Sequence, residues 1–126
     1  MNFEQELEDW LTKGLEKEIP ASVKAFSFNL FEPASIDNVK FGIELIGAEV
    51  FDPSDSDWAC EEIWEPESRQ LNIPIAYSGE NWESCLEVMK ELVLKLINSE
   101  KLKHLKSREG IGIGFVDGDL EVIWKP

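Results

Sequence analysis

The sequence contains few of the residues that usually carry catalysis or bind metal ions, with one histidine and two cysteines among 126 residues. His104 lies in the basic stretch KLKHLKSR, without a cysteine close to it in sequence, and we interpret it as an exposed linker residue. Cys60 and Cys85 are each interpreted as a small buried apolar side chain, the usual role of an unpaired cysteine. A zinc site or a Cys–His dyad built from these residues stays open as an alternative. We predict that the protein is not an enzyme and has no cofactor and no metal site.

Export and membrane-spanning signals are also missing. The first residues, MNFEQELEDW, lack the basic and apolar regions of a standard secretory signal. Apolar runs such as ELVLKLI are broken by charges and are far shorter than a membrane span. Together with the low cysteine content, this predicts a cytoplasmic protein with reduced thiols. No repeat, low-complexity segment or long linker divides the chain, so we expect one domain over residues 1–126.

Positive charge is scarce, because 12 lysines and arginines stand against 26 aspartates and glutamates, a formal net charge of −14. Such a surface repels nucleic acid and anionic lipid, so we expect no nucleic-acid and no membrane partner. It attracts cationic partners and speeds their association, although the acidity also has the simpler explanation of keeping the protein soluble. Residues 99–108 are the basic exception. We expect this stretch to dock against the acidic body, the alternative being that it binds an anion.

Apolar residues at helical spacing predict two amphipathic helices, over residues 2–17 and 82–98. Asn2 and Asn81 are suitable N-caps for them. In the second helix the apolar stripe is formed by Trp82, Cys85, Leu86, Met89, Val93 and Leu96.

An apolar side chain at every second position predicts strands over 23–31, 39–45 and 71–77. The first two are expected to form an antiparallel hairpin. The alternation changes phase at Gly47, which indicates a β-bulge. Pro74 cannot donate a ladder hydrogen bond, so the third strand is expected at an edge of the sheet.

The last residues, GIGIGFVDGDLEVIW, predict a C-terminal β-hairpin with a two-residue turn at Asp117–Gly118. Counting outward from this turn pairs apolar residues across the strands: Phe115 with Leu120, Ile113 with Val122, and Ile111 with Trp124. The alternate glycines then lie on the opposite face. They do not match a dinucleotide-binding loop, which has different spacing and lies between a strand and a helix. Either another part of the chain packs closely on them or that face is open.

These elements predict an α+β fold, with an antiparallel sheet of about five or six strands, two helices packed on one face and a C-terminal β-hairpin. That arrangement buries every apolar stripe at once.

The stretch DPSDSDWACEEIWEPE, residues 52–67, holds seven carboxylates and two tryptophans but no lysine or arginine. Tryptophan is common at interface hot spots, and carboxylates pair well with arginine. We therefore predict a surface that binds a basic protein, formed by Asp52, Asp55, Asp57, Trp58, Glu61, Glu62 and Trp64. The alternative is a solvated loop whose tryptophans fill the core. The part WACEEIW fits a strand or a short helix equally well.

Closely spaced carboxylates also raise the question of calcium. Counted from Asp55, an EF-hand loop needs an oxygen ligand, a glycine and a glutamate where the chain has Ala59, Cys60 and Pro66. The EF-hand pattern therefore fails, and only an irregular calcium site stays open.

In its size, acidity and general layout, the chain resembles the bacterial immunity proteins of polymorphic and contact-dependent toxin systems. The stretches FGIELIGAEVFDPSDSDWACEEIWEPE and GFVDGDLEVIW carry the resemblance. It implies a cytoplasmic domain that neutralises a toxin, often a basic nuclease, by covering its active site, and it assigns no site residues. Our first hypothesis is such a stoichiometric inhibitor. The second is a housekeeping adaptor or a self-associating domain, a homodimer built through a sheet edge or the glycine face, and the third is a small hydrolase.

Overall fold

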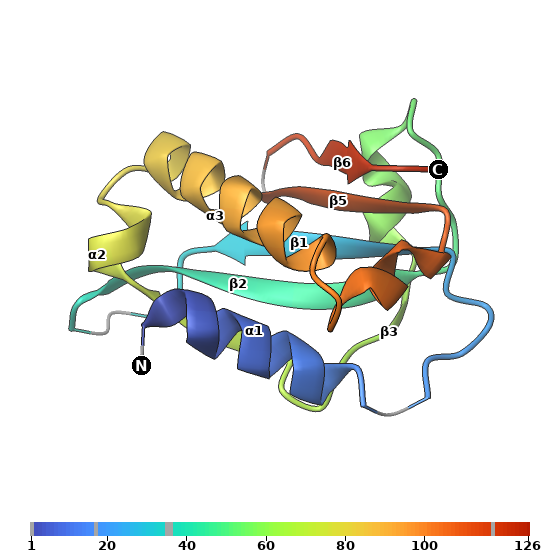
Figure 1. The fold of residues 1–126 in the computed structure, drawn as a ribbon. Coiled ribbons are helices and arrows are strands. Elements are labelled where there is room, and N and C mark those ends of the chain that lie inside the picture. The colour runs from blue at the N-terminus through green and yellow to red at the C-terminus, as the bar shows by residue number, and fades with distance from the viewer. Residues whose placement is uncertain (1, 17, 35–36, 117) are drawn as a thin grey trace.

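The computed structural model describes residues 2–16, 18–34, 37–116 and 118–126, without the side chains of Ser56 and His104. The elements follow one another along the chain in this order: α1 (Phe3–Gly14), β1 (Ala25–Phe31), β2 (Val39–Ala48), the 3-10 helix η1 (Ser56–Cys60), β3 (Glu62–Trp64), β4 (Gln70–Pro74), α2 (Ile75–Ser78), α3 (Trp82–Ile97), the 3-10 helix η2 (Lys103–Ser107), β5 (Gly110–Phe115) and β6 (Glu121–Trp124). The predicted α+β fold is confirmed, including the C-terminal β5–β6 hairpin (Figure 1).

The six strands form one sheet in the order β3-β2-β1-β5-β6, and β4 pairs with the other end of β2. All pairs are antiparallel except β1 with β5, which run parallel. We expected antiparallel pairs throughout. The difference arises because the chain crosses back along α3 after β4, so that β5 enters the sheet in the direction of β1.

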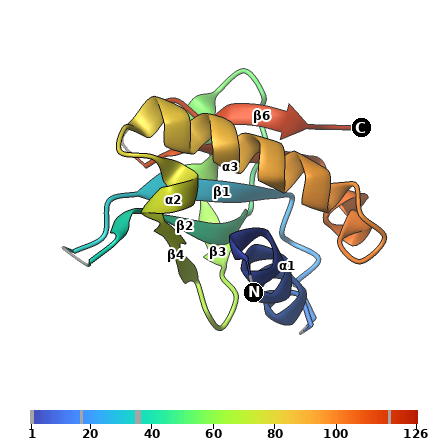
Figure 2. The same cartoon turned by 60° about the vertical axis from the view of Figure 1, so that its left-hand side comes forward.

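Both long helices pack on one face of the sheet, as predicted (Figures 1 and 2). Asn2 and Asn81 cap α1 and α3 by accepting hydrogen bonds from backbone N–H groups of the first helical turn. Leu7 and Leu11 of α1 and Met89 of α3 are completely buried in the main core. Among the described residues, no helix has the length and apolar character needed to cross a membrane.

The opposite face of the sheet is covered by the connection that contains η1, which lies behind the sheet in Figure 1. A smaller apolar cluster forms there around Trp58, with Phe51 and Leu120 packed against it. A Cβ at Gly110 would lie 2.3 Å from the ring of Phe51, and one at Gly112 would lie 2.9 Å from the ring of Trp58. The alternate glycines of β5 therefore make room for these rings. The glycine face is closed, which removes it as a surface for self-association.

Two predicted strand details are wrong. The strand expected over 71–77 ends at Pro74, because proline has no N–H to continue the ladder, and Ile75 begins the short helix α2 instead. In the C-terminal hairpin only Ile111 and Trp124 pair as expected.

A register shift in that hairpin places Gly112 opposite Val122 and Ile113 opposite Glu121. The strands are separated by residues 116–120 rather than by two residues, and Asp117 lies outside the described residues. The β-bulge expected at Gly47 is confirmed by a register shift between Gly47 and Ala48.

Candidate functional site

The acidic segment, residues 49–67, runs from the end of β2 through η1 and β3 and is held by its two tryptophans. Trp58 is only 2% exposed and meets Phe51 edge to face at 5.1 Å. Trp64 is half-buried and meets Phe26 edge to face at 5.9 Å. Trp58, which we predicted to be part of the binding surface, is buried, and its ring fills the smaller core cluster, as expected under the alternative of core-filling tryptophans. The ambiguous stretch WACEEIW forms both structures in turn, a 3-10 helix and then a short strand.

The carboxylates of this segment stay on the surface. Asp52, Asp55, Asp57, Glu61 and Glu62 are all exposed. Asp52 accepts hydrogen bonds from the backbone N–H and the hydroxyl of Ser54, which lower the pKa of its carboxyl group. Asp55 accepts a hydrogen bond from the backbone N–H of Asp57 and caps η1. These local bonds fix the shape of the loop while leaving its negative charge at the surface.

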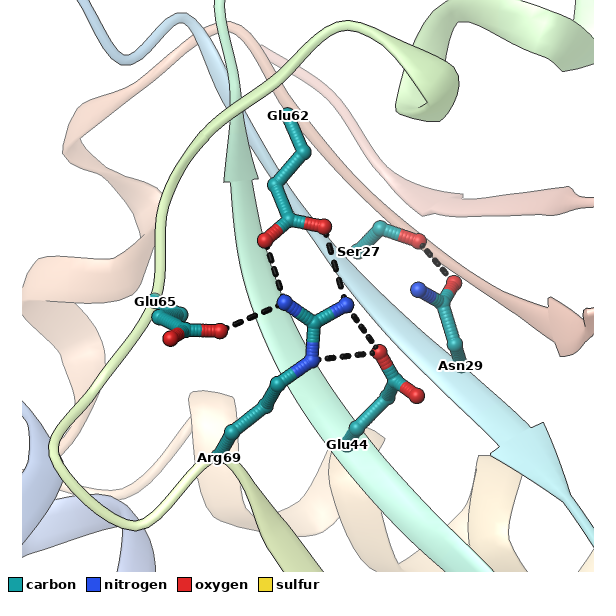
Figure 3. A network of polar contacts seen from close by, with 6 residues as sticks. All are labelled: Ser27, Asn29, Glu44, Glu62, Glu65 and Arg69. Atoms are coloured by element: carbon teal, nitrogen blue, oxygen red, sulfur yellow. Dashed lines mark hydrogen bonds and ion pairs between the residues drawn. The ribbon is translucent and has the colours of Figure 1, made fainter.

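A single arginine gathers three glutamates beside this segment (Figure 3). Arg69 donates from Nε and Nη2 to the same oxygen of Glu44, at 2.9 and 2.6 Å. It also donates through both Nη atoms to Glu62, and through Nη1 to Glu65 at 2.5 Å. Every one of the five guanidinium N–H groups thus has a carboxylate acceptor. The hydrogen bond to Glu62 is the main reason that the pKa of Arg69 is raised.

Sequence reasoning missed this network, although the chain contains a signal for it. Arg69 is the only basic residue between Lys40 and Lys90, and Glu44 lies within an otherwise apolar strand. Glu44 is buried, at 6% exposure, and such a carboxylate needs a charged or hydrogen-bonding partner. The network fastens β3 and the β3–β4 connection onto β2. Because its donors are all occupied, Arg69 holds the fold together and is not free to bind an anion.

The two cysteines lie in different surroundings. Cys85 is completely buried in the main core, and this burial raises the pKa of its thiol to about 12. Cys60 is exposed at the end of η1, contrary to the expectation that it is buried. The side chain of His104 lies outside the described residues. In the part of the chain that is described, no three histidine, cysteine or acidic side chains are placed to hold a metal ion.

The predicted basic stretch contacts the chain itself. Lys101 forms an ion pair with Glu8 of α1 at 3.2 Å. Arg108 donates to the backbone carbonyl groups of Ile19, Pro20 and Val23 in the connection between α1 and β1. These contacts agree with docking against the body of the protein.

A second feature, which sequence reasoning missed, is an apolar groove where the parallel strands β1 and β5 end beside the start of α3. It has a volume of about 760 Å³. Six apolar residues line it: Phe31, Trp82, Leu86, Phe115, Val116 and Leu120. Glu32, Asp119 and Glu121 form its acidic rim. Trp82 was assigned to the buried stripe of its helix, but it is 56% exposed, because the first turn of α3 extends past the core.

The sequence predicted one binding surface with both carboxylates and tryptophans, but the structure places the exposed carboxylates and the exposed tryptophan in different parts of the molecule. Exposed carboxylates gather on the acidic segment, near the start of β1, whereas the exposed tryptophan lies in the groove, near the end of β1. Comparison of the chain with protein-family models, with curated proteins and with solved structures finds no match.

Proposed function

We propose that the protein is an acidic protein-binding module that neutralises a basic partner by steric and electrostatic blocking, in the manner of an immunity protein. The observation that carries this proposal is the rigid display of exposed carboxylates on the acidic segment. The segment contains eight acidic residues and no lysine or arginine. A surface of this kind attracts and orients a cationic partner without any chemical step.

Two features of the segment favour a role of its carboxylates in binding a partner over a role in solubility alone. Its backbone is held by the packing of Trp58 and Trp64, and Asp52, Asp55, Glu62 and Glu65 accept hydrogen bonds, so binding would cost little backbone entropy. The acids are also concentrated, because the segment and Arg69 together account for seven of the fourteen net negative charges. A solubilising surface needs charge, but it has no need of a fixed shape or of this concentration.

The test compares two variants of equal charge in affinity capture from the source cell, followed by titration with the purified partner. The first replaces Asp55, Asp57 and Glu61 by Asn, Asn and Gln, which keeps the capping oxygen of Asp55 and leaves Glu62 on Arg69. The control makes the same charge change on the exposed helical face, with Glu6, Glu87 and Glu91 replaced by Gln. We expect the first variant to associate about tenfold more slowly than the control.

Raising the salt concentration from 0.05 to 0.2 M is expected to slow association of the natural protein by a similar factor, because screening weakens steering. Capture of the same partner with unchanged kinetics by both variants would rule out this role for the acidic segment. A concentration-dependent dimer that is insensitive to salt would favour the self-associating domain instead.

A further inference from the structure

The apolar groove differs from ordinary exposed apolar residues. Single apolar side chains on a surface are common and need no explanation. Here Trp82 and Val116 are 56% and 61% exposed, and both line one hollow that also contains half-buried aromatic and leucine side chains. A concave, mostly apolar site of 760 Å³ has the size and character of a binding site.

The groove is supported from below by packed aromatic rings. Trp82 meets Phe115 edge to face at 6.3 Å, and Phe115 in turn meets the completely buried Phe41 at 5.4 Å. Phe31 packs over Gly42, where a Cβ would lie 2.6 Å from its ring. The walls are therefore fixed by the main fold, and a ligand would find the groove already formed.

The rim determines which ligand the groove favours. Glu32, Asp119 and Glu121 surround the apolar floor, and the lining contains no lysine or arginine among the described residues. Lys90 of α3 forms an ion pair with Glu121 at 2.5 Å, so the negative charge of the rim comes mainly from Glu32 and Asp119. The rim therefore favours a ligand with apolar side chains flanked by positive charge.

The same charges oppose the other obvious occupants. A second copy would bring its own acidic rim, within a chain of net charge −14, against this one. An anionic membrane surface would be repelled in the same way.

We propose that this groove is a second contact site for the partner and receives a protein segment with large apolar residues flanked by arginine or lysine. The exposed ring of Trp82 is then the hot spot, packing against the apolar side chain and offering its face to a neighbouring guanidinium group. This inference rests on the proposed function in taking the partner to be a basic protein. The two sites lie near opposite ends of β1, whose seven residues span about 20 Å. One partner could therefore contact both.

The test uses the whole protein and three capped synthetic peptides, followed through amide and indole signals in two-dimensional NMR. The probe peptide carries Leu-Phe-Leu between pairs of arginines. One comparison peptide has glutamates in place of the arginines, and the other has Gly-Ser-Gly at its centre. We expect only the probe to shift the indole signal of Trp82 and the amide signals of Leu86, Val116 and Leu120.

Variants then locate the site. Trp82→Ala should weaken probe binding at least roughly tenfold, whereas Ile63→Ala, at another exposed apolar residue, should leave it within about twofold. Reversing the rim with Glu32→Lys and Asp119→Lys should make the glutamate peptide the better ligand, and the same change at Glu6 and Glu91 should not. The remaining indole signals report whether each variant is folded.

Three results would overturn the inference. The three peptides could bind equally well, or the Trp82→Ala substitution could leave the affinity for the probe peptide unchanged. The third is a shift of the groove signals with protein concentration alone, as binding of a second copy would cause. None of these results depends on the acidic segment. The Asp55, Asp57 and Glu61 variant leaves the groove intact, so failure of either site can be recognised separately.

Discussion

Cys85 shows how one buried residue can be assigned a role from its surroundings. It lies on the face of α3 that packs on the sheet, with no exposed surface, and the burial raises the pKa of its thiol from 9.0 to about 12. A nucleophilic cysteine needs the opposite shift, because the thiolate is the reactive form. Cys60, by contrast, is exposed.

We expect one thiol, that of Cys60, to react rapidly with a thiol reagent in the folded protein, and both to react after unfolding. The pKa shift also predicts the effect of alkaline pH on stability. The folded state holds the Cys85 proton more tightly, so the unfolded state ionises first above about pH 9 and the free energy of unfolding falls as the pH rises from 9 towards 12.

The loss for this one group is at most about 1.4 kcal/mol per pH unit. Denaturant unfolding of the natural protein and of Cys85→Ala, measured between pH 8 and 11, separates the contribution of Cys85 from that of other titrating groups. The difference between the free energies of unfolding of the two proteins should become smaller as the pH rises. A constant difference would show that the thiol is not protected by burial.

At the scale of the elements, the Arg69 network joins parts of the chain that the core alone does not fasten. β3 has three residues, and Glu62 and Glu65 connect it and the following turn to Glu44 on β2 through the one guanidinium. Arg69 also keeps the buried carboxylate of Glu44 paired. An isolated buried charge is costly, whereas a matched apolar replacement of both partners is tolerated.

Arg69→Leu is therefore expected to lower the free energy of unfolding by about 2 kcal/mol, a value reduced from that of fully buried pairs because Arg69 is 32% exposed. The double variant Glu44→Leu with Arg69→Leu should recover part of this loss. Lys95→Ala, which breaks an exposed pair with Glu4, is the matched control and should cost less than about 1 kcal/mol. Urea unfolding of the four proteins provides the measurement. Equal losses for Arg69→Leu and Lys95→Ala would mean that Glu44 does not need its partner.

Some of these elements could be predicted from the sequence and others could not. The two long helices, with their asparagine caps, and the β1–β2 hairpin follow from patterns within a few residues, and all are confirmed. The parallel pairing of β1 with β5 and the register of the last hairpin depend on contacts between distant segments, which local periodicity does not contain.

The features of the candidate site also fall into two groups, those that the local sequence predicts and those that depend on contacts between distant segments. The exposed acids were predictable from composition. The burial of Trp58 depends on the glycines of β5, about fifty residues away in the sequence. The groove likewise requires the end of β1, the start of α3 and the last hairpin to meet.

For the molecule as a whole, the net charge of −14 acts on folding and on binding in opposite directions. Repulsion among the carboxylates is stronger in the compact state than in the extended unfolded chain, so it lowers stability. The same charges attract a cationic partner. If the acids of the acidic segment are kept for binding, their removal should strengthen the free protein while weakening the complex, the usual trade-off at functional sites.

We therefore expect the variant of Asp55, Asp57 and Glu61 to unfold at a higher temperature than the natural protein at 0.01 M salt, where the screening length is about 30 Å, and to lose most of this advantage at 0.1 M, where it is about 10 Å. Thermal unfolding at the two salt concentrations measures the effect, with the Glu6, Glu87 and Glu91 variant as control. Because the acids of the acidic segment are the more concentrated, neutralising three of them should raise stability by more than the same change on the helical face. Equal gains would indicate an evenly distributed charge whose main effect is solubility, and the acidic segment would then have no distinct role as a binding surface.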